Sequence, residues 1–202
     1  MTGTEASNRI LTIPNLVSFV RLLGIPVFWW ALLVEDDVVL AAWLIFIIGW
    51  TDWIDGYLAR RLGQVSELGK ILDPVADRLM IASAVIGGLI AGVLPTWFGW
   101  GLIIREILVG AIALNLAGRG GGTVEVRFLG KTATFALYGA IPAFYLAAAG
   151  AAEWLLWPVA WILGLIGLVL YWYVAFLYIG DSRAKLAALK SSPDPRRLDG
   201  DS

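Results

Sequence analysis

The chain has 202 residues, of which 59% are hydrophobic and 15% are charged, whereas about 25% of residues are charged in a typical globular protein. A chain of this size cannot bury so much apolar surface in a water-soluble fold, so the composition excludes a soluble enzyme and also a disordered chain. The net charge of −1 argues against a nucleic-acid partner.

The sequence contains neither Cys nor His. The absence of Cys excludes disulfides, thiolate nucleophiles and zinc–thiolate sites. The absence of His excludes a Ser-His-Asp relay, imidazole metal ligands and an imidazole proton shuttle. Any catalysis must therefore use carboxylates, Lys, Arg, hydroxyl groups and hard cations.

Six apolar stretches are long enough to cross a bilayer, which takes about 20 mostly apolar residues in a helix. The predicted fold class is therefore an all-α integral membrane protein with six transmembrane helices. In chain order the stretches are 16–34, 38–59, 72–94, 95–117, 133–149 and 154–179.

The segments outside these stretches complete the predicted domain organisation. Residues 1–15 are expected to form an N-terminal juxtamembrane segment at the membrane interface, without a cleavable signal peptide. Residues 16–180 are expected to form one membrane domain. Residues 181–202 contain Pro193 and Pro195 and are predicted to be a disordered tail.

The distribution of charge predicts the orientation in the membrane. All 15 Lys and Arg residues lie in the spans, or in the N-terminus, the tail and the two loops that share their side. The opposite loops carry only acidic charge, at Glu35, Asp36, Asp37 and Glu153. By the positive-inside rule both termini are cytoplasmic, and the prediction is a multi-pass protein of the plasma membrane with its active site on the cytoplasmic side.

Two of the predicted helices carry paired aspartates, Asp52 with Asp55 and Asp73 with Asp77. At 100° per residue each pair falls on one helix face, and the short connection lets the two helices return antiparallel. Four unpaired carboxylates in a membrane would cost on the order of 10 kcal/mol. Because the chain offers oxygen ligands but no imidazole or thiolate, Mg²⁺ or Mn²⁺ would offset this cost best.

These acids have two other interpretations. The acids could cap helix ends and pair with neighbouring bases, which is common for one or two acids but not for four on two facing surfaces. Intramembrane carboxylates also line cation and proton transporters, so a transporter is the remoter alternative to an enzyme. The small residues Gly56 and Ala59 beside the acids leave room for a ligand and favour the enzyme.

The pattern Asp52-x₂-Asp55-Gly56-x₂-Ala59-Arg60-x₈-Gly69-x₃-Asp73-x₃-Asp77 resembles the signature of the CDP-alcohol phosphotransferase family at all eight positions. Residues 12–21 and 72–78 are similar to its branch of bacterial phosphatidylglycerophosphate and cardiolipin synthases. The resemblance implies a six-span enzyme of phospholipid biosynthesis that acts on CDP-diacylglycerol among membrane lipids. It also implies a homodimer.

The same resemblance assigns roles to the matching positions. Asp52, Asp55, Asp73 and Asp77 would bind two divalent ions, Mg²⁺ or Mn²⁺, that bridge the diphosphate of the CDP-lipid. Asp77 would also be the general base that takes the proton from the acceptor hydroxyl, which then attacks the β-phosphorus and releases CMP. The residues expected to hold the cytidine diphosphate are Asn15, Gly56, Ala59, Arg60 and Gly69.

Three basic residues are predicted to bind a phosphate of the acceptor. Arg105 lies in the middle of the fourth span, where a guanidinium is costly unless it faces a wet cavity or a partner. Glu106 is adjacent and is expected to point elsewhere on the helix, so that it does not simply neutralise Arg105. Arg127 and Lys131 precede the fifth span and would complete the phosphate site.

Two acceptors fit this prediction. Glycerol-3-phosphate would give phosphatidylglycerophosphate, and phosphatidylglycerol would give cardiolipin. By the family resemblance, the pair Arg105-Glu106 favours glycerol-3-phosphate, because the cardiolipin branch more often has Arg-Asp. The single Lys in residues 130–134 departs from the usual pattern of the synthases that use glycerol-3-phosphate. Glycerol-3-phosphate is the preferred acceptor and a cardiolipin synthase is the alternative.

Trp and Gly residues carry structural predictions. Most of the 11 Trp residues lie near predicted span ends, which is typical of an interfacial aromatic belt. Gly139, Gly164 and Gly167 are predicted to mark close helix contacts, with a dimer face as one form of such a contact.

Overall fold

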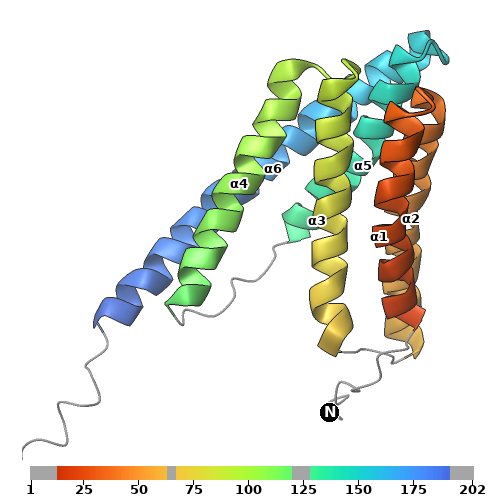
Figure 1. Ribbon diagram of the computed structural model, residues 1–202. Coiled ribbons are helices and arrows are strands. Elements are labelled where there is room, and N and C mark those ends of the chain that lie inside the picture. The colour runs from red at the N-terminus through yellow and green to blue at the C-terminus, as the bar shows by residue number, and fades with distance from the viewer. Residues whose placement is uncertain (1–12, 63–66, 120–127, 192–202) are drawn as a thin grey trace, which may run out of the picture.

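The computed structural model describes residues 13–62, 67–119 and 128–191, and the side chains at 13–17, 52–74, 128 and 187–191 lie outside that description. The described residues form six α-helices (Figure 1). Their bounds are α1 Ile13–Leu33, α2 Val38–Leu62, α3 Glu67–Ile90, α4 Thr96–Gly118, α5 Phe128–Ala148 and α6 Glu153–Ser191.

Each predicted apolar stretch corresponds to one helix, so the all-α class is confirmed. Within the described residues, two helical segments are long and apolar enough to cross a membrane, Thr96–Gly118 and Glu153–Leu186. Shorter apolar segments lie in α1 and α2, at Ser18–Leu33 and Val38–Thr51. These helices are consistent with a membrane protein, and the six crossings stay a prediction.

The last helix is longer than the sequence analysis predicted. Helix α6 continues to Ser191, so residues 181–191 are helical although they were predicted to belong to a disordered tail. Ala, Leu, Lys and Arg dominate this stretch, and all four are strong helix formers. No proline occurs between Pro158 and Pro193, so no proline stops the helix earlier. Residues 192–202 lie outside the described residues.

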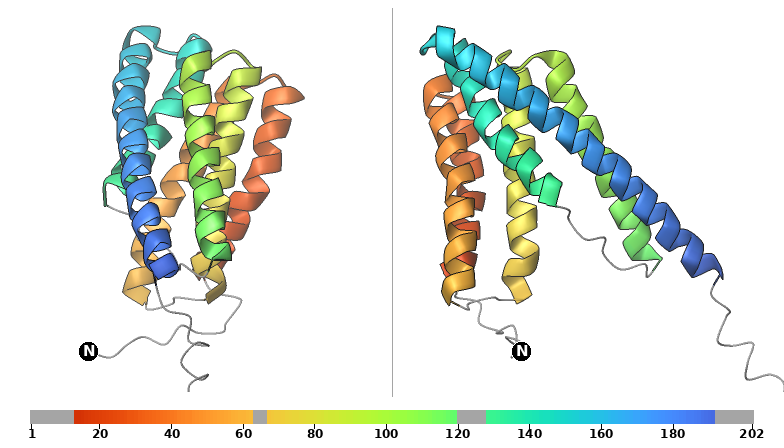
Figure 2. Two further views of the ribbon diagram at one scale, coloured as in Figure 1. Left: turned by 90° about the vertical axis from the view of Figure 1, so that its left-hand side faces the viewer. Right: turned by 180° about the vertical axis from the view of Figure 1, so that it is seen from behind.

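The helices form two groups that share one end of the bundle. Helix α1 packs against both α2 and α3, while α5 packs against α6 and α2, and α4 packs against α6. Helices α4 and α6 incline away from α1–α3 towards the other end, and α5 lies between the groups (Figures 1 and 2). The signature helices α2 and α3 are therefore held by α1 on one side and reached by α5 on the other.

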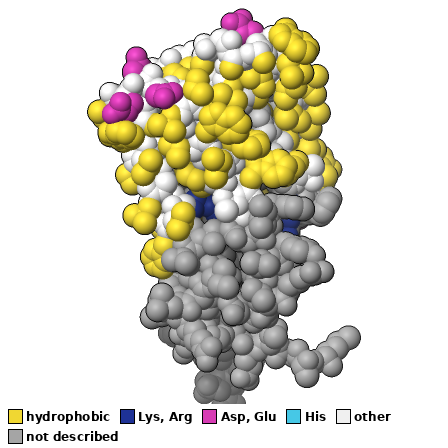
Figure 3. Space-filling view, turned by 90° about the vertical axis from the view of Figure 1, so that its right-hand side faces the viewer, with side chains coloured by type: hydrophobic (Ala, Val, Ile, Leu, Met, Phe, Trp, Pro, Cys, Tyr) yellow, Lys and Arg dark blue, Asp and Glu magenta, His cyan; other side chains and the backbone are white. Residues whose placement is uncertain are grey.

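The outer surface is apolar and the charges are segregated. Large side chains such as Trp30, Trp97 and Trp154 are exposed, and hydrophobic groups cover the described face shown in Figure 3. Acidic side chains gather at one end of that face and Lys or Arg appear towards the other (Figure 3). An apolar band between charges of opposite sign is what a bilayer stabilises, in contrast to the surface of a soluble protein.

The predicted close contacts at glycines are confirmed, and they lie within the chain rather than at a dimer face. A Cβ atom on Gly164 would lie 3.2 Å from ring atoms of both Phe98 and Phe144. A Cβ atom on Gly167 would lie 2.9 Å from Leu137 Cδ2 and 3.3 Å from the Leu137 backbone nitrogen. These glycines let α6 approach α4 and α5 closely, as small residues do in membrane proteins.

Gly167→Ala is expected to destabilise the fold, because the new methyl group meets the α5 backbone as well as a side chain. Overpacking of this kind costs about 1–3 kcal/mol. The matched control is Gly110→Ala, since a Cβ there has no neighbour within 4 Å. Thermal unfolding in detergent should show a lower Tm for Gly167→Ala only, and an equal Tm in both variants would contradict the packing argument.

Candidate active site

The family-like signature lies on α2 and α3, the helices before and after residues 63–66. Positions 52–60 lie in α2 and positions 69–77 in α3, and both segments lie towards the same end of the bundle (Figure 1). Antiparallel placement, as predicted, brings the two halves of the signature to one end. Side chains at 52–74 lie outside the description, so Asp77 is the signature residue whose contacts can be followed.

The predicted metal and nucleotide ligands are placed by helix but not by side chain. Among the described residues no three His, Cys, Asp or Glu side chains come together as a metal-binding group. The positions concerned are Asp52, Asp55, Gly56, Ala59 and Arg60 in α2, Gly69 and Asp73 in α3, and Asn15 in α1.

Asp77 is half-buried on α3 and accepts a hydrogen bond at Oδ1 from the hydroxyl group of Tyr138 on α5. Tyr138 itself is buried. Tyr138 is not among the site residues predicted from the sequence, although a signal exists: a tyrosine in the middle of an apolar span needs a partner for its hydroxyl group. The hydrogen bond ties the last residue of the signature to a third helix.

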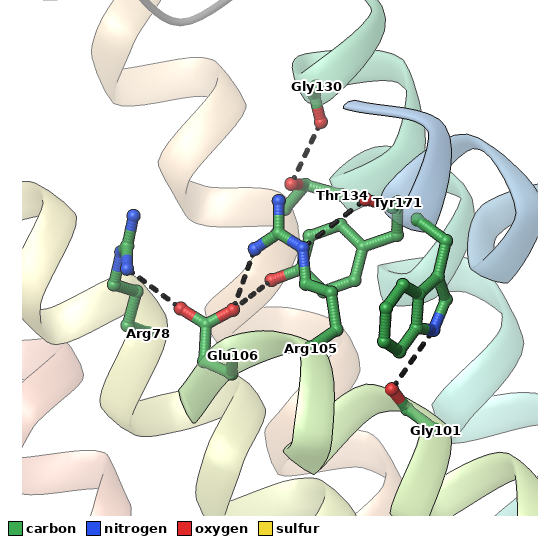
Figure 4. A network of polar contacts seen from close by, with 8 residues as sticks. Arg78, Gly101, Arg105, Glu106, Gly130, Thr134 and Tyr171 are labelled. Carbon is green, nitrogen blue, oxygen red and sulfur yellow. Dashed lines mark hydrogen bonds and ion pairs between the residues drawn. The ribbon is translucent and has the colours of Figure 1, made fainter. Parts of the chain in front are cut away.

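Arg105 and Glu106 form an ion pair, so the expectation that Glu106 points away from Arg105 is wrong. Arg105 Nη1 lies 2.9 Å from Glu106 Oε2 (Figure 4). Both side chains are long enough to bend towards Tyr171, whose hydroxyl group donates to Glu106 Oε2 at 2.6 Å. In an apolar bundle an unpaired guanidinium is so costly that this shared partner outweighs the helical divergence of neighbouring residues.

The same carboxylate also binds a second guanidinium. Glu106 Oε1 lies 2.9 Å from Nη1 of Arg78, which projects from α3 (Figure 4). Glu106 therefore accepts from groups on three helices, α3, α4 and α6. Charge-assisted hydrogen bonds of this kind are stronger than neutral ones. The bond from Arg78, the residue after Asp77, holds α3 at a set distance from α4.

Arg105 faces partners rather than an open wet cavity. It is 6% exposed, its Nε donates to the backbone oxygen of Tyr171 at 3.2 Å, and its guanidinium carbon lies 3.6 Å from the centre of the Tyr171 ring. Nη2 has no hydrogen-bond partner among the described residues.

The other two predicted acceptor ligands are placed less fully. Lys131 is exposed in the first turn of α5, seven residues before Tyr138 and thus about 10 Å along the helix. Arg127 lies outside the described residues. A joint phosphate site of Arg105, Arg127 and Lys131 stays a prediction.

Together the described polar groups form one layer across the bundle. It links α3 to α5 through Asp77, α3 to α4 through Arg78, and α4 to α6 through Glu106. We call it the polar layer; its members are Asp77, Arg78, Arg105, Glu106, Tyr138 and Tyr171.

Comparison with known proteins identifies the class. The sequence model of the CDP-alcohol phosphatidyltransferase family matches residues 11–178, which include both halves of the signature and every member of the polar layer. The chain belongs to this family and is an enzyme of phospholipid biosynthesis, a phosphatidyltransferase.

Two relatives illustrate its neighbourhood within the family. The chain is 36% identical over 192 residues to the cardiolipin synthase (CMP-forming) of Streptomyces coelicolor, covering 90% of this chain and 87% of that protein. It is also 36% identical over 151 residues to the CDP-diacylglycerol–glycerol-3-phosphate 3-phosphatidyltransferase of Bacillus subtilis, covering 68% of this chain and 78% of that one. The family resemblance seen in the sequence is confirmed.

Replacing Glu106 by Gln is expected to destabilise the protein by about 3–5 kcal/mol, because it leaves the buried charge of Arg105 without its counter-charge. Tyr171→Phe removes one hydrogen bond and keeps the ring beside Arg105, so about 1 kcal/mol is expected. Thermal unfolding of the two variants in the same detergent measures the difference. Equal losses would show that charge neutralisation is not the main role of Glu106.

Proposed function

We propose that this enzyme transfers the phosphatidyl group of CDP-diacylglycerol to the hydroxyl group of a glycerol-based acceptor that carries a phosphate. The observation that carries the proposal is the complete signature on α2 and α3, inside a family match that spans residues 11–178. The polar layer supports it, because it holds Asp77 among charged groups in an otherwise apolar bundle.

The aspartates fit a pair of divalent cations by the chemistry of their donors. Asp52, Asp55, Asp73 and Asp77 offer only carboxylate oxygens, which Mg²⁺ and Mn²⁺ prefer. The family generally depends on divalent metals. When bound, the two cations would neutralise charge on the diphosphate of the lipid donor.

The chain's own residues would then bind the donor and move a proton. Asn15, Gly56, Ala59, Arg60 and Gly69 would hold the cytidine diphosphate. The carboxylate of Asp77 would take the proton of the acceptor hydroxyl as its oxygen forms a bond to the β-phosphorus. The bond from that phosphorus to the bridging oxygen breaks, and CMP leaves with the electron pair.

The acceptor that we favour is phosphatidylglycerol. The relative named as a CMP-forming cardiolipin synthase aligns over 90% of this chain, against 68% for the relative named for glycerol-3-phosphate. Asp77 aside, since it serves as base and metal ligand in this proposal, the ion-paired group of Arg78, Arg105 and Glu106 has two positive charges and one negative charge, which leaves a single positive charge. That charge suits a phosphodiester with one negative charge better than a phosphomonoester, which carries about −1.5 to −2 at pH 7.

Glycerol-3-phosphate is the second candidate. The Arg105-Glu106 sequence favours it, as does the Bacillus subtilis relative. Arg105 Nη2, with Arg127 and Lys131, would supply the additional positive charge that this acceptor needs.

The proposal includes a location and an assembly. Six crossings, cytoplasmic termini and a cytoplasmic active site agree with the acidic end seen in Figure 3 and with the signature lying towards the opposite end (Figure 1). We place the enzyme in the plasma membrane as a multi-pass protein and expect a homodimer.

Purified protein incubated with CDP-diacylglycerol and Mg²⁺ or Mn²⁺ is expected to release CMP when phosphatidylglycerol is added, and EDTA should abolish the release. Parallel reactions contain glycerol-3-phosphate alone, and lipid products are separated by chromatography. If CMP is released only with glycerol-3-phosphate, that compound is the acceptor and the proposed role of the signature is unchanged. If no CMP is released with either acceptor, the proposed function is wrong and the transporter becomes the favoured interpretation.

Asp77→Asn is expected to abolish transfer, because an amide cannot accept the proton of the hydroxyl group, while binding of CDP-diacylglycerol is largely retained. Turnover and equilibrium binding of the donor are measured on the same preparation. Full activity in the variant would remove Asp77 from the role of general base.

A further inference from the structure

The tyrosine that contacts Asp77 has no role in the function proposed above. We propose that Tyr138 is a positioning residue for the reaction: its ring lies between the two signature helices and its hydroxyl group orients the carboxylate of Asp77. This inference rests on the proposed function, since it concerns the base and metal ligand of that reaction.

The hydrogen bond restricts Asp77 directly. Tyr138 is 6% exposed, and its hydroxyl group donates to Asp77 Oδ1. A carboxylate that is bonded at one oxygen loses the freedom to rotate, and a general base must be held within hydrogen-bond reach of the proton it takes. A buried phenol is well suited to this task because packing fixes its ring and leaves one polar atom to direct.

Gly49 shows that the fold makes room for this ring. A Cβ atom at this buried position of α2 would lie 2.2 Å from Tyr138 Cδ1, 2.6 Å from Cε1 and 2.9 Å from Cγ, distances that no real side chain tolerates. Only glycine lets the ring pack this closely against α2, three residues before Asp52. Tyr138 therefore contacts α2 through its ring and α3 through its hydroxyl group. It thereby influences the distance between these two helices, which carry the two halves of the signature.

A second tyrosine on α5 separates positioning from simple helix attachment. Tyr145 lies seven residues after Tyr138, and its hydroxyl group donates at 2.6 Å to the backbone oxygen of Ala84, seven residues after Asp77. Both tyrosines are buried, and both tie α5 to α3. They differ in the acceptor, which is a signature carboxylate for Tyr138 and a backbone carbonyl for Tyr145.

The test compares Tyr138→Phe with its matched control Tyr145→Phe in the full-length protein. Loss of an orienting partner typically costs 10–100-fold in activity or metal affinity, so kcat should fall by about 10–100-fold in Tyr138→Phe, with the KM for CDP-diacylglycerol unchanged. Tyr145→Phe should keep its kcat. Thermal unfolding of both variants checks that each loses a similar amount of stability.

A second measurement avoids turnover altogether. Mn²⁺ is titrated into the protein without substrate, and free Mn²⁺ is followed by its electron paramagnetic resonance signal. The Mn²⁺ dissociation constant should rise in Tyr138→Phe and not in Tyr145→Phe, because Asp77 is a predicted ligand.

Gly49→Ala provides a variant that leaves Tyr138 in place. Its methyl group should displace the ring and reproduce the loss in kcat, and the double variant with Tyr138→Phe should lose little more than either single variant, because both act on one hydrogen bond. Fully additive losses in kcat would overturn the inference.

The outcomes separate this inference from the function on which it rests. If the unaltered protein releases CMP and the two Tyr→Phe variants lose kcat and Mn²⁺ affinity equally, Tyr138 only attaches the helices and the inference alone fails. If the unaltered protein releases no CMP with either acceptor, the proposed function fails and the inference falls with it.

Discussion

The carboxylate of Glu106 is the group on which the rest of the polar interior depends. It lies within hydrogen-bond distance of two guanidinium groups and one phenol, which project from three helices. Arg105 is buried in an apolar bundle, where leaving its guanidinium unpaired would carry a large penalty. Because Glu106 on α4 binds Arg78 of α3 and Tyr171 of α6, these three helices must keep one relative height. That height is the level of Asp77, which precedes Arg78 on α3, so the pairing of these charges also fixes the depth of the candidate site.

A second constraint follows from the acids themselves. If the four aspartates of α2 and α3 face one another as predicted, their carboxylates repel and do not by themselves hold these helices together. In the described part of the chain α1 packs more extensively against each of them than they pack against each other. Helix α5 adds contacts to both, through Gly49 on α2 and through Asp77 and Ala84 on α3. The scaffold thus holds the two halves of the signature from outside.

The sequence predicts the parts of this arrangement that follow from local pattern. Apolar stretches locate all six helices, and the spacing of the signature indicates the family, because both depend on residues near one another in the chain. The pairing of Arg105 with Glu106 could not be predicted, since it depends on Tyr171, 65 residues beyond Glu106. The bond from Tyr138 to Asp77 joins residues 61 positions apart. Side-chain partners between distant helices are decided by packing, which the pattern of one sequence does not encode.

These constraints suggest why the acceptor is harder to predict than the donor. The donor would be recognised by the signature, whose residues lie on two consecutive helices. The acceptor would be recognised by the net charge near Arg105, which depends on whether Glu106 neutralises that residue. In isolation Arg105 indicates a strongly anionic acceptor, but Glu106 pairs with both Arg105 and Arg78, and these three ion-paired residues together have one surplus positive charge. Members of one family could therefore differ in acceptor through the partners of a single buried arginine while the signature stays the same.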